Sequence, residues 1–453
     1  MVNGNFSTHR ESLWITRYSS SRGVRCQWGI GLKAVETTTR FGFLSQLSFL
    51  ARQRVGFGLY LKTMTLITNS QALKEFCAPL HNEAFITVDT EFMREKTYWP
   101  QLCLVQIGGP DEAAAIDPLA DSIDLTPMYD LFDDESIVKV FHAARQDLEI
   151  FLHLTDRLPV PVFDTQVAAM VCGFGESVGY EQLVAKLANA RLDKGSRFTD
   201  WARRPLSERQ ISYALADVTH LRVAYEKLHQ RLERENRTAW IEEEMTVLRE
   251  PATYLPDPAD VYKRIKGRGG KGKFLAVLRE LAAWREIEAR RRDVPRNRVL
   301  RDETLVEIAH HTPENADALG RTRGLGEKAA HGPMGAAILA AVTTGRDLPK
   351  SDWPTPPSRP DIPRGIGPIA DLLKVLLKKV SEDTNVAGRL IASSADIDLL
   401  AGLGADAEIA ALKGWRREIF GDDALRLRSG ELALSIEGNR LAVRDVPPAK
   451  AAE

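Results

Sequence analysis

The segment that most restricts the fold of this chain is residues 84–92. Its first five residues are apolar or β-branched, which is typical of a strand, and the carboxylates of Asp89 and Glu91 follow. Because side chains alternate faces along a strand, both acids project on the same side and can reach one cation. A solvated strand end has the same pattern, so the choice between the two interpretations depends on the rest of the chain.

Composition sets the limits of the interpretation. The 453 residues predict roughly two to four domains. With 61 basic and 62 acidic residues, the net charge of -1 gives no general attraction to a polyanion, so any such attraction must come from local clusters. The four cysteines have no zinc-like spacing, which indicates free thiols in a reducing compartment. No apolar run reaches the length of about 18 residues that spans a membrane, and we expect a cytoplasmic protein.

Residues 1–63 differ from the rest of the chain. They contain nine lysines and arginines against two acids, together with many Ser, Thr and Gly residues. This composition resembles a transit peptide. Because Met64 opens a well-patterned sequence, an upstream mis-start is the alternative. Either way, we expect a disordered extension without chemistry.

The order of predicted elements indicates a mixed α/β sheet flanked by helices. A strand at 66–68 leads into a helix that Asn69 or Ser70 caps. Further strands are predicted at 101–109, 113–117, 137–142 and 160–163, and the short connections between the first of these predict an antiparallel meander. Helices are predicted near 125–132, after 143, and at 180–188 and 207–234. We assign residues 64–250 to this α/β domain.

After residue 251 the strands stop and helical patterning takes over. We expect a basic linker or an irregular docking segment at 251–272 and a helical domain at 273–346. A Pro-rich linker at 347–367, a second helical domain at 368–446 that ends in a hairpin, and a tail at 447–453 are expected to follow. Both helical blocks begin with a long amphipathic helix, then a polar turn and short capped helices. They are therefore interpreted as a weak repeat.

Two further acids stand where the fold could bring them to Asp89 and Glu91. Asp147 lies just inside the helix after 143, and Asp217 shares a helix face with Tyr213, four residues earlier. Four carboxylates suit a pair of hard divalent ions. Two ions about 3.5–4 Å apart can activate a water and stabilise the leaving 3′ oxygen of a phosphodiester.

These segments resemble the three motifs of the DEDD 3′→5′ exonucleases, in the tyrosine-bearing subclass. The wider pattern at 85–92, 98–106 and 193–206 is similar to the ribonuclease D family. The resemblance covers residues 64 to about 446, because both helical blocks resemble the helicase-and-RNase-D C-terminal (HRDC) domain. It implies an α/β ribonuclease H-like exonuclease domain followed by two all-α HRDC-type domains.

The resemblance also implies a mechanism and a substrate. Asp89, Glu91, Asp147 and Asp217 would bind two Mg²⁺ or Mn²⁺ ions, and Tyr213 would position the attacking water. The implied activity is a monomeric 3′→5′ exoribonuclease that releases 5′-mononucleotides from tRNA precursors with 3′ extensions and from other structured RNAs. A DNA exonuclease of the same mechanism and a catalytically silent RNA-binding scaffold are the alternatives.

Several other residues have two interpretations. Lys194, Arg197, Arg203 and Arg204 flank Trp201 and are candidates for nucleic-acid binding, although a solvated helix start has the same composition. A denser basic cluster at 263–301 favours nucleic acid over a solvated face. Asp164 is expected to cap a helix rather than to serve as a fifth metal ligand. His142 is expected to be hydrogen-bonded, with an approach to substrate as the alternative.

Overall fold

The computed structural model describes residues 65–192, 195, 199–266, 270, 272–355 and 362–447. All of them belong to one unit of the chain, Leu59–Glu453. The expectations for residues 1–63, for Lys194 and Arg197, and for residues 448–453 lie outside the described residues. Among the helices of the described ranges, none has the length and apolar character needed to cross a bilayer.

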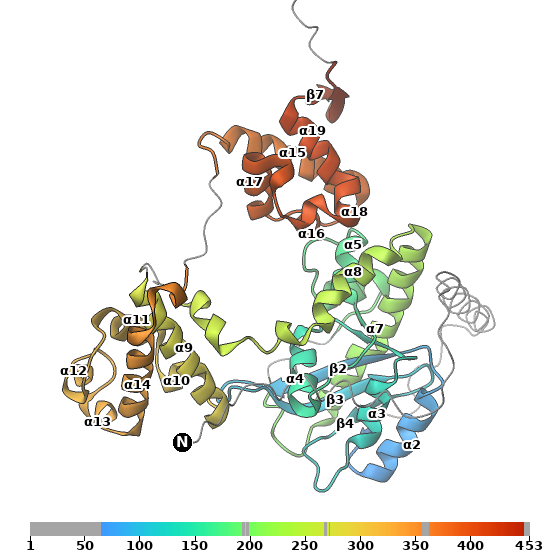
Figure 1. The fold of residues 1–453 in the computed structure, drawn as a ribbon. Coiled ribbons are helices and arrows are strands. Elements are labelled where there is room, and N and C mark those ends of the chain that lie inside the picture. The colour runs from blue at the N-terminus through green and yellow to red at the C-terminus, as the bar shows by residue number, and fades with distance from the viewer. Residues whose placement is uncertain are drawn as a thin grey trace, which may run out of the picture. The chain divides into compact units, whose positions relative to one another are not determined.

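A mixed sheet forms the centre of the first part of the chain (Figure 1). Its strand order is β1-β4-β3-β2-β5-β6, with the bounds β1 Thr65–Ile67, β2 Phe85–Met93, β3 Gln101–Gly108, β4 Ala113–Ile116, β5 Val138–Phe141 and β6 Val162–Asp164. Strands β2, β3 and β4 are the antiparallel meander that the short connections predict. The other three strands join in parallel. The predicted α/β class is therefore confirmed.

Helices cover both faces of this sheet. On one face, α2 (Ser70–Leu80), α3 (Thr126–Asp133) and α4 (Arg145–Thr155) bury their apolar side chains against the strands. On the other face, the long helix α7 (Glu208–Arg234) crosses β2, β3 and β4. The helices α5 (Thr165–Val171), α6 (Tyr180–Leu187) and α8 (Thr238–Arg249) pack beside it. As predicted, Asn69 caps α2, and its side-chain oxygen accepts from the amide of Ala72 at 2.9 Å.

Two helical segments follow. The first contains α9 (Lys273–Arg292), α10 (Arg296–Val299), α11 (Asp302–His311), α12 (Ala316–Gly320), α13 (Glu327–Ala330) and α14 (Pro333–Asp347). In the segment at 251–272, the 3-10 helix η3 (Pro258–Arg264) packs on α9 and buries Tyr262 and Ile265 in the same core. This packing favours the expected docking segment over the linker.

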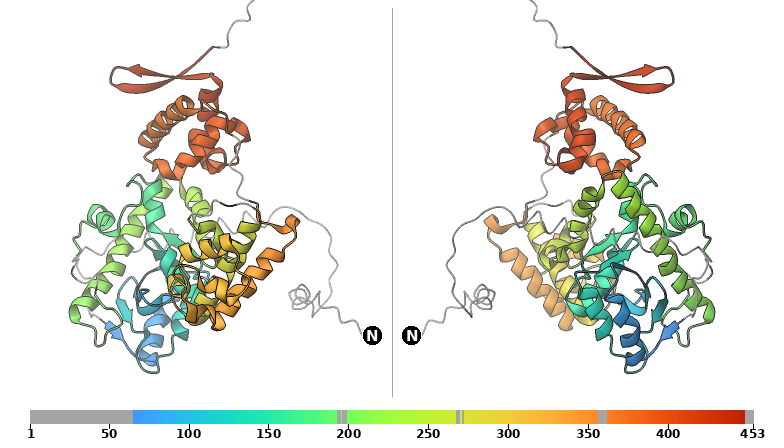
Figure 2. Two further views of the ribbon diagram at one scale, coloured as in Figure 1. Left: turned by 90° about the vertical axis from the view of Figure 1, so that its left-hand side faces the viewer. Right: turned by 90° about the vertical axis from the view of Figure 1, so that its right-hand side faces the viewer.

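The second helical segment shares the layout of the first. It contains α15 (Gly367–Thr384), α16 (Gly388–Ile391), α17 (Ser394–Leu403), α18 (Gly414–Arg416) and α19 (Asp422–Ser429). In each segment a long helix ends at a left-handed residue, Asp293 or Asn385, and helices of four and ten residues follow. The predicted hairpin is present as β7 (Leu432–Glu437) and β8 (Arg440–Asp445), which Figure 2 shows as a two-stranded ribbon.

Polar contacts join the helical segments to the first part of the chain. The carboxylate of Asp293 accepts from the backbone amides of Tyr98 and Trp99 at 3.0 Å each, and the Tyr98 hydroxyl bonds Glu286. In the second segment, Arg416 pairs with acids of α8, and its neighbour Trp415 stacks on Trp240 with ring centroids 4.4 Å apart.

Lys139 is an unexpected member of the core. It lies on β5 between β2 and β6, and none of its surface is exposed. Its ammonium donates to the carbonyl oxygens of Asp134, Ile137 and Val160 at 2.6, 2.9 and 2.7 Å. Burial lowers the pKa of Lys139 to about 8, while nearby acids oppose the shift. The lysine therefore ties the loops at one end of β5 together.

We predict that Lys139→Met destabilises the protein by about 2–4 kcal/mol, because three buried carbonyls lose their donor. The variant no longer buries an ammonium, and this gain offsets only part of the loss. Urea unfolding measures this change. Lys74→Met is the control, since Lys74 is exposed on α2 and its loss should change stability by less than about 0.5 kcal/mol. Equal stability of the two variants would contradict the structural role of Lys139.

Candidate metal-dependent active site

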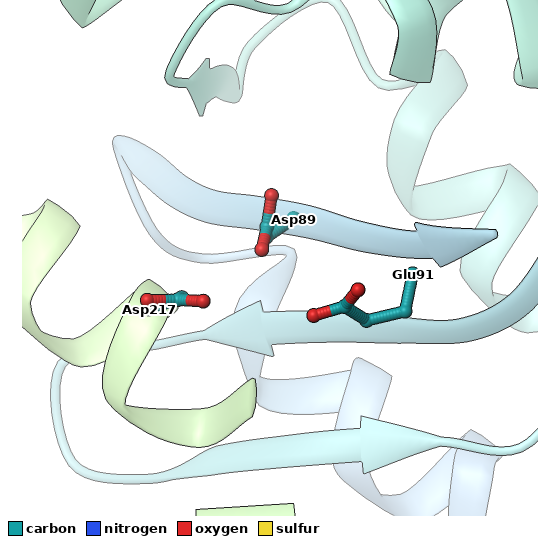
Figure 3. Close-up of side chains that lie close together, drawn as sticks. All are labelled: Asp89, Glu91 and Asp217. Atoms are coloured by element: carbon teal, nitrogen blue, oxygen red, sulfur yellow. The ribbon is translucent and has the colours of Figure 1, made fainter. Parts of the chain in front are cut away.

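Three carboxylates meet at the end of β2. Asp89 and Glu91 project from one face of β2, and Asp217 reaches them from α7 (Figure 3). One ligand oxygen from each lies within 4.8 Å of the others, and the group has the composition of a metal site. The register of β2 against β3 shifts between Glu91 and Phe92. Such bulges re-aim side chains beside active sites, and no residue pattern in this segment indicates the bulge.

Helix α7 reaches the strand through a close contact. The hydroxyl of Thr87 donates to the backbone carbonyl of Val218 at 2.8 Å. Gly108 is the strand partner of Thr87, and a Cβ at Gly108 would lie 3.2 Å from the same carbonyl oxygen and 2.4 Å from the Thr87 hydroxyl. The absence of a side chain at Gly108 thus brings Asp217 next to Asp89.

Asp147 stands outside the group of three but borders it. It is buried near the start of α4, and the hydroxyl of Thr90 donates to its carboxylate at 2.5 Å. Asp164 fixes the start of this helix, because its carboxylate accepts from the amides of Ala143 and Ala144 at 2.9 Å each. It also caps α5 through Gln166, so the predicted cap is confirmed.

The acids raise one another's pKa. Burial raises the pKa of Asp89 well above its ordinary value, and the charge of Asp217 adds to the effect. Burial likewise raises the pKa of Asp147, with the charge of Asp89 as the next cause. Carboxylates crowded in this way repel one another in the absence of a counter-charge. A divalent cation supplies that charge, so the donor set fits a hard metal ion.

A cavity of about 340 Å³ opens beside the acids. It is lined by Asp89, His142, Gly179, Tyr180, Glu181, Gln182, Leu192, Tyr213, Asp217 and Leu221. Tyr213 lies where the sequence places it, hydrogen-bonded to Asp217. A larger hollow of about 520 Å³ in the second helical segment contains none of these acids.

The cavity also contains residues that the sequence analysis missed or left open. The Tyr180 hydroxyl donates to the backbone carbonyl of Asp217, which joins α6 to α7. His142 is hydrogen-bonded as expected, since its Nδ1 lies 3.0 Å from the Thr165 hydroxyl. It also lines the cavity, and its approach to a substrate stays a prediction. Tyr180 follows Gly179 at an ordinary helix start, and no spacing signal distinguishes it.

Two of the four basic candidates can be placed. Arg203 is exposed. Arg204 instead forms two hydrogen bonds of 2.6 Å with the buried carboxylate of Asp117 and donates to the carbonyls of Cys103 and Trp201. Trp201 is buried against α7. Because the donors of Arg204 already face protein acceptors, the structure favours a structural role for it, and phosphate binding by Arg203 and Arg204 stays a prediction.

Part of the denser basic cluster is also paired within the protein. Lys263 pairs with Asp260, Arg290 and Arg296 pair with Glu286, and Arg291 pairs with Glu288. Glu286 is fully buried, and the two arginines that pair with it also donate to the hydroxyl of Tyr98. The remaining bases Arg264, Lys266, Lys273, Arg298 and Arg301 are exposed, so the nucleic-acid surface stays a prediction that concerns these residues.

Comparisons with known proteins show which families this chain resembles. Residues 64–233 match a family model described as a 3′-5′ exonuclease, and residues 274–342 match the HRDC domain. The chain is 51% identical to ribonuclease D of Granulibacter bethesdensis over 378 residues, which cover 83% of this chain and 95% of the relative. Ribonuclease D of Acidiphilium cryptum is 49% identical over 84% of this chain and 97% of its own.

A solved structure gives the same result. The crystal structure of Escherichia coli RNase D superposes with a TM-score of 0.70 at 32% identity, and the match covers 81% of this chain and 98% of that one.

We predict that Asp89→Asn stabilises the metal-free protein at pH 7–8 by about 1 kcal/mol, a rise of about 2–4 °C in melting temperature. The pKa of Asp89 is raised in the folded state. The contribution of Asp89 to stability is therefore fully present below its unfolded pKa, near 3.9, and is lost as the pH rises through its folded pKa. The gain should therefore vanish near pH 4. Thermal unfolding in EDTA measures it.

The control for this prediction is Asp111→Asn, which removes an exposed acid from the β3–β4 turn and should leave the melting temperature unchanged. Added Mn²⁺ should raise the melting temperature of the wild type and not that of Asp89→Asn. Equal melting temperatures of wild type and Asp89→Asn in EDTA at pH 8 would show that the acids do not repel.

For the adjacent arginines we predict losses of stability of very different size. Arg204→Met leaves Asp117 buried without its cation and should cost about 3 kcal/mol of folding free energy, whereas Arg203→Met should cost less than about 0.5 kcal/mol. Denaturant unfolding of both variants measures the difference. If both variants keep wild-type stability and both bind RNA less tightly, Arg204 contacts phosphate after all.

Proposed function

We propose, from the premise that this chain belongs to the ribonuclease D family, that it is a 3′→5′ exoribonuclease whose four acids hold two Mg²⁺ or Mn²⁺ ions. The observation that supports this most directly is the approach of Asp89, Glu91 and Asp217 to within 4.8 Å. Asp147 completes the proposed set, since its carboxylate lies close enough to Asp89 for the charge of Asp89 to raise the pKa of Asp147.

When bound, two such ions activate a water and stabilise the leaving 3′ oxygen. The protein's own groups then determine orientation. Burial raises the pKa of the Tyr213 phenol, as do the charges of Asp217, Glu91 and Asp89, so the hydroxyl stays protonated. Its proton bonds Asp217, and its oxygen can accept from the attacking water and so orient it. Burial lowers the pKa of His142 to about 4, so its imidazole stays neutral and offers the substrate a hydrogen bond without a charge.

The substrate class is a finer proposal. The cavity beside the acids has the size of a small-molecule site, which suits a single terminal nucleotide on an unpaired 3′ tail. The Escherichia coli relative is described as an exoribonuclease involved in structured RNA processing. We propose that this chain trims tRNA precursors with 3′ extensions and releases 5′-mononucleotides, as a monomer in the cytoplasm.

The domain division is proposed on the same basis. Residues 64–250 form the exonuclease domain, and the first HRDC domain extends to about residue 346 and takes in η3 as part of its core. The matching order of helices in residues 368–446 supports a second HRDC-like domain. These domains would hold the structured part of the RNA while its tail reaches the acids.

We predict that wild-type protein shortens a 5′-labelled tRNA precursor from its 3′ end in Mg²⁺ or Mn²⁺ and not in EDTA. Asp89→Ala should lower the rate by at least about 10³-fold, because it removes a proposed ligand. A denaturing gel that resolves single-nucleotide steps measures this. A DNA strand of the same sequence is the control for the sugar. Shortening of the DNA alone would favour the DNA exonuclease, and metal-dependent binding without shortening would favour the scaffold.

A further inference from the structure

Gln106 is a buried amide that the proposed mechanism does not use. It lies in the middle of β3, and none of its surface is exposed. Within the part of the chain that the structure describes, neither its side-chain oxygen nor its nitrogen has a hydrogen-bond partner. Buried side-chain polar atoms in folded proteins are mostly paired, so a fully buried amide with both atoms unpaired requires an explanation.

The position of Gln106 supplies one. Its partner across the β2–β3 ladder is Asp89, and directly opposed residues of an antiparallel pair project on the same face with their Cβ atoms about 4.5–5.5 Å apart. On the other side its partner is Ala115 of β4, which packs against α7. The amide therefore lies between the sheet and α7, in the layer where Figure 3 shows the carboxylates of Asp89 and Asp217.

The chemistry of the two neighbours is complementary. An ionised carboxylate only accepts hydrogen bonds, and a carboxamide has two N–H donors. In metal sites, the ligand oxygens that do not face the ion are generally fixed by donors from a surrounding layer. Among the described residues, the Gln106 amide has no partner although Asp89 lies opposite it, so both of its N–H donors remain available to a carboxylate that turns toward it.

We propose that Gln106 is a positioning residue of the metal site, and that its side-chain amide donates to the carboxylate of Asp89 when the site is loaded. This inference rests on the proposed function, because it assumes that Asp89 is a metal ligand. Gln106 neither lines the cavity nor belongs to the group of carboxylates. Its part is to hold one ligand in the orientation that binding requires, and the unpaired amide of the metal-free state is the cost of having that donor in place.

The test compares Mn²⁺ binding by isothermal titration calorimetry in wild type, Gln106→Met and Leu104→Met. Methionine nearly conserves the volume of glutamine and removes both polar atoms. Leu104 is the matched control, since it lies two residues away on the same face of β3, is equally buried and packs under α7. Thermal unfolding in EDTA reports whether each variant folds.

We expect Gln106→Met to melt in EDTA at or above the wild-type temperature, because no amide is left unpaired, yet to bind Mn²⁺ about 10-fold more weakly or worse. Leu104→Met should bind within about twofold of wild type. A merely structural glutamine would change stability and not metal affinity. If Gln106→Met does not fold, Gln106→Asn keeps the amide but shortens its reach, and the same loss of affinity is expected.

The outcomes separate this inference from the proposed function. If wild type binds Mn²⁺ and Gln106→Met binds it equally well, Gln106 has no positioning role and the metal site stands. If Leu104→Met loses as much affinity as Gln106→Met, the effect comes from packing under α7 and the proposal is overturned. If folded wild type binds no Mn²⁺, the proposed metal site is wrong and the proposed role of Gln106 is overturned as well.

Discussion

The mutual repulsion of carboxylates between β2, α4 and α7 is the constraint on which the rest of the nuclease part depends. Burial and neighbouring charge raise the pKa of Asp89 and Asp147, so holding the acids together costs free energy that other contacts must offset. Those contacts are visible around the site. Thr87 and Gly108 bring α7 to the sheet, and Asp164 fixes the start of α4.

The sequence was sufficient for the parts of the structure that depend on local patterning. Strand alternation placed Asp89 and Glu91 on one face, and helical spacing placed Tyr213 and Asp217 on another. The cap at Asn69, the β2–β3–β4 meander and the terminal hairpin follow from turn and cap chemistry within a few residues. Each of these features needs only neighbours in the chain, and each was predictable for that reason.

Features that depend on distant partners were not predictable. Arg204 has the composition of a phosphate-binding segment until Asp117, 87 residues earlier, is seen to neutralise it. Lys139 alternates like an exposed strand residue, but its sheet is covered on both faces and its ammonium finds carbonyls from two loops. The same holds for η3, whose apolar residues gain a core only when α9 packs on them. Pairing across the fold, not residue type, decides these roles.

Asp164 has two structural roles, and they affect how mutational screens of this chain are interpreted. It caps α5 and also holds the turn before α4, so its loss would displace Asp147 without touching any ligand. A screen scored on activity alone would count Asp164 as a fifth ligand. The stability of the metal-free protein separates ligand variants from Asp164 variants. Loss of a ligand relieves repulsion between the acids, whereas loss of Asp164 leaves backbone amides buried without an acceptor. Inactive variants of this fold are therefore best sorted by the stability of the metal-free protein.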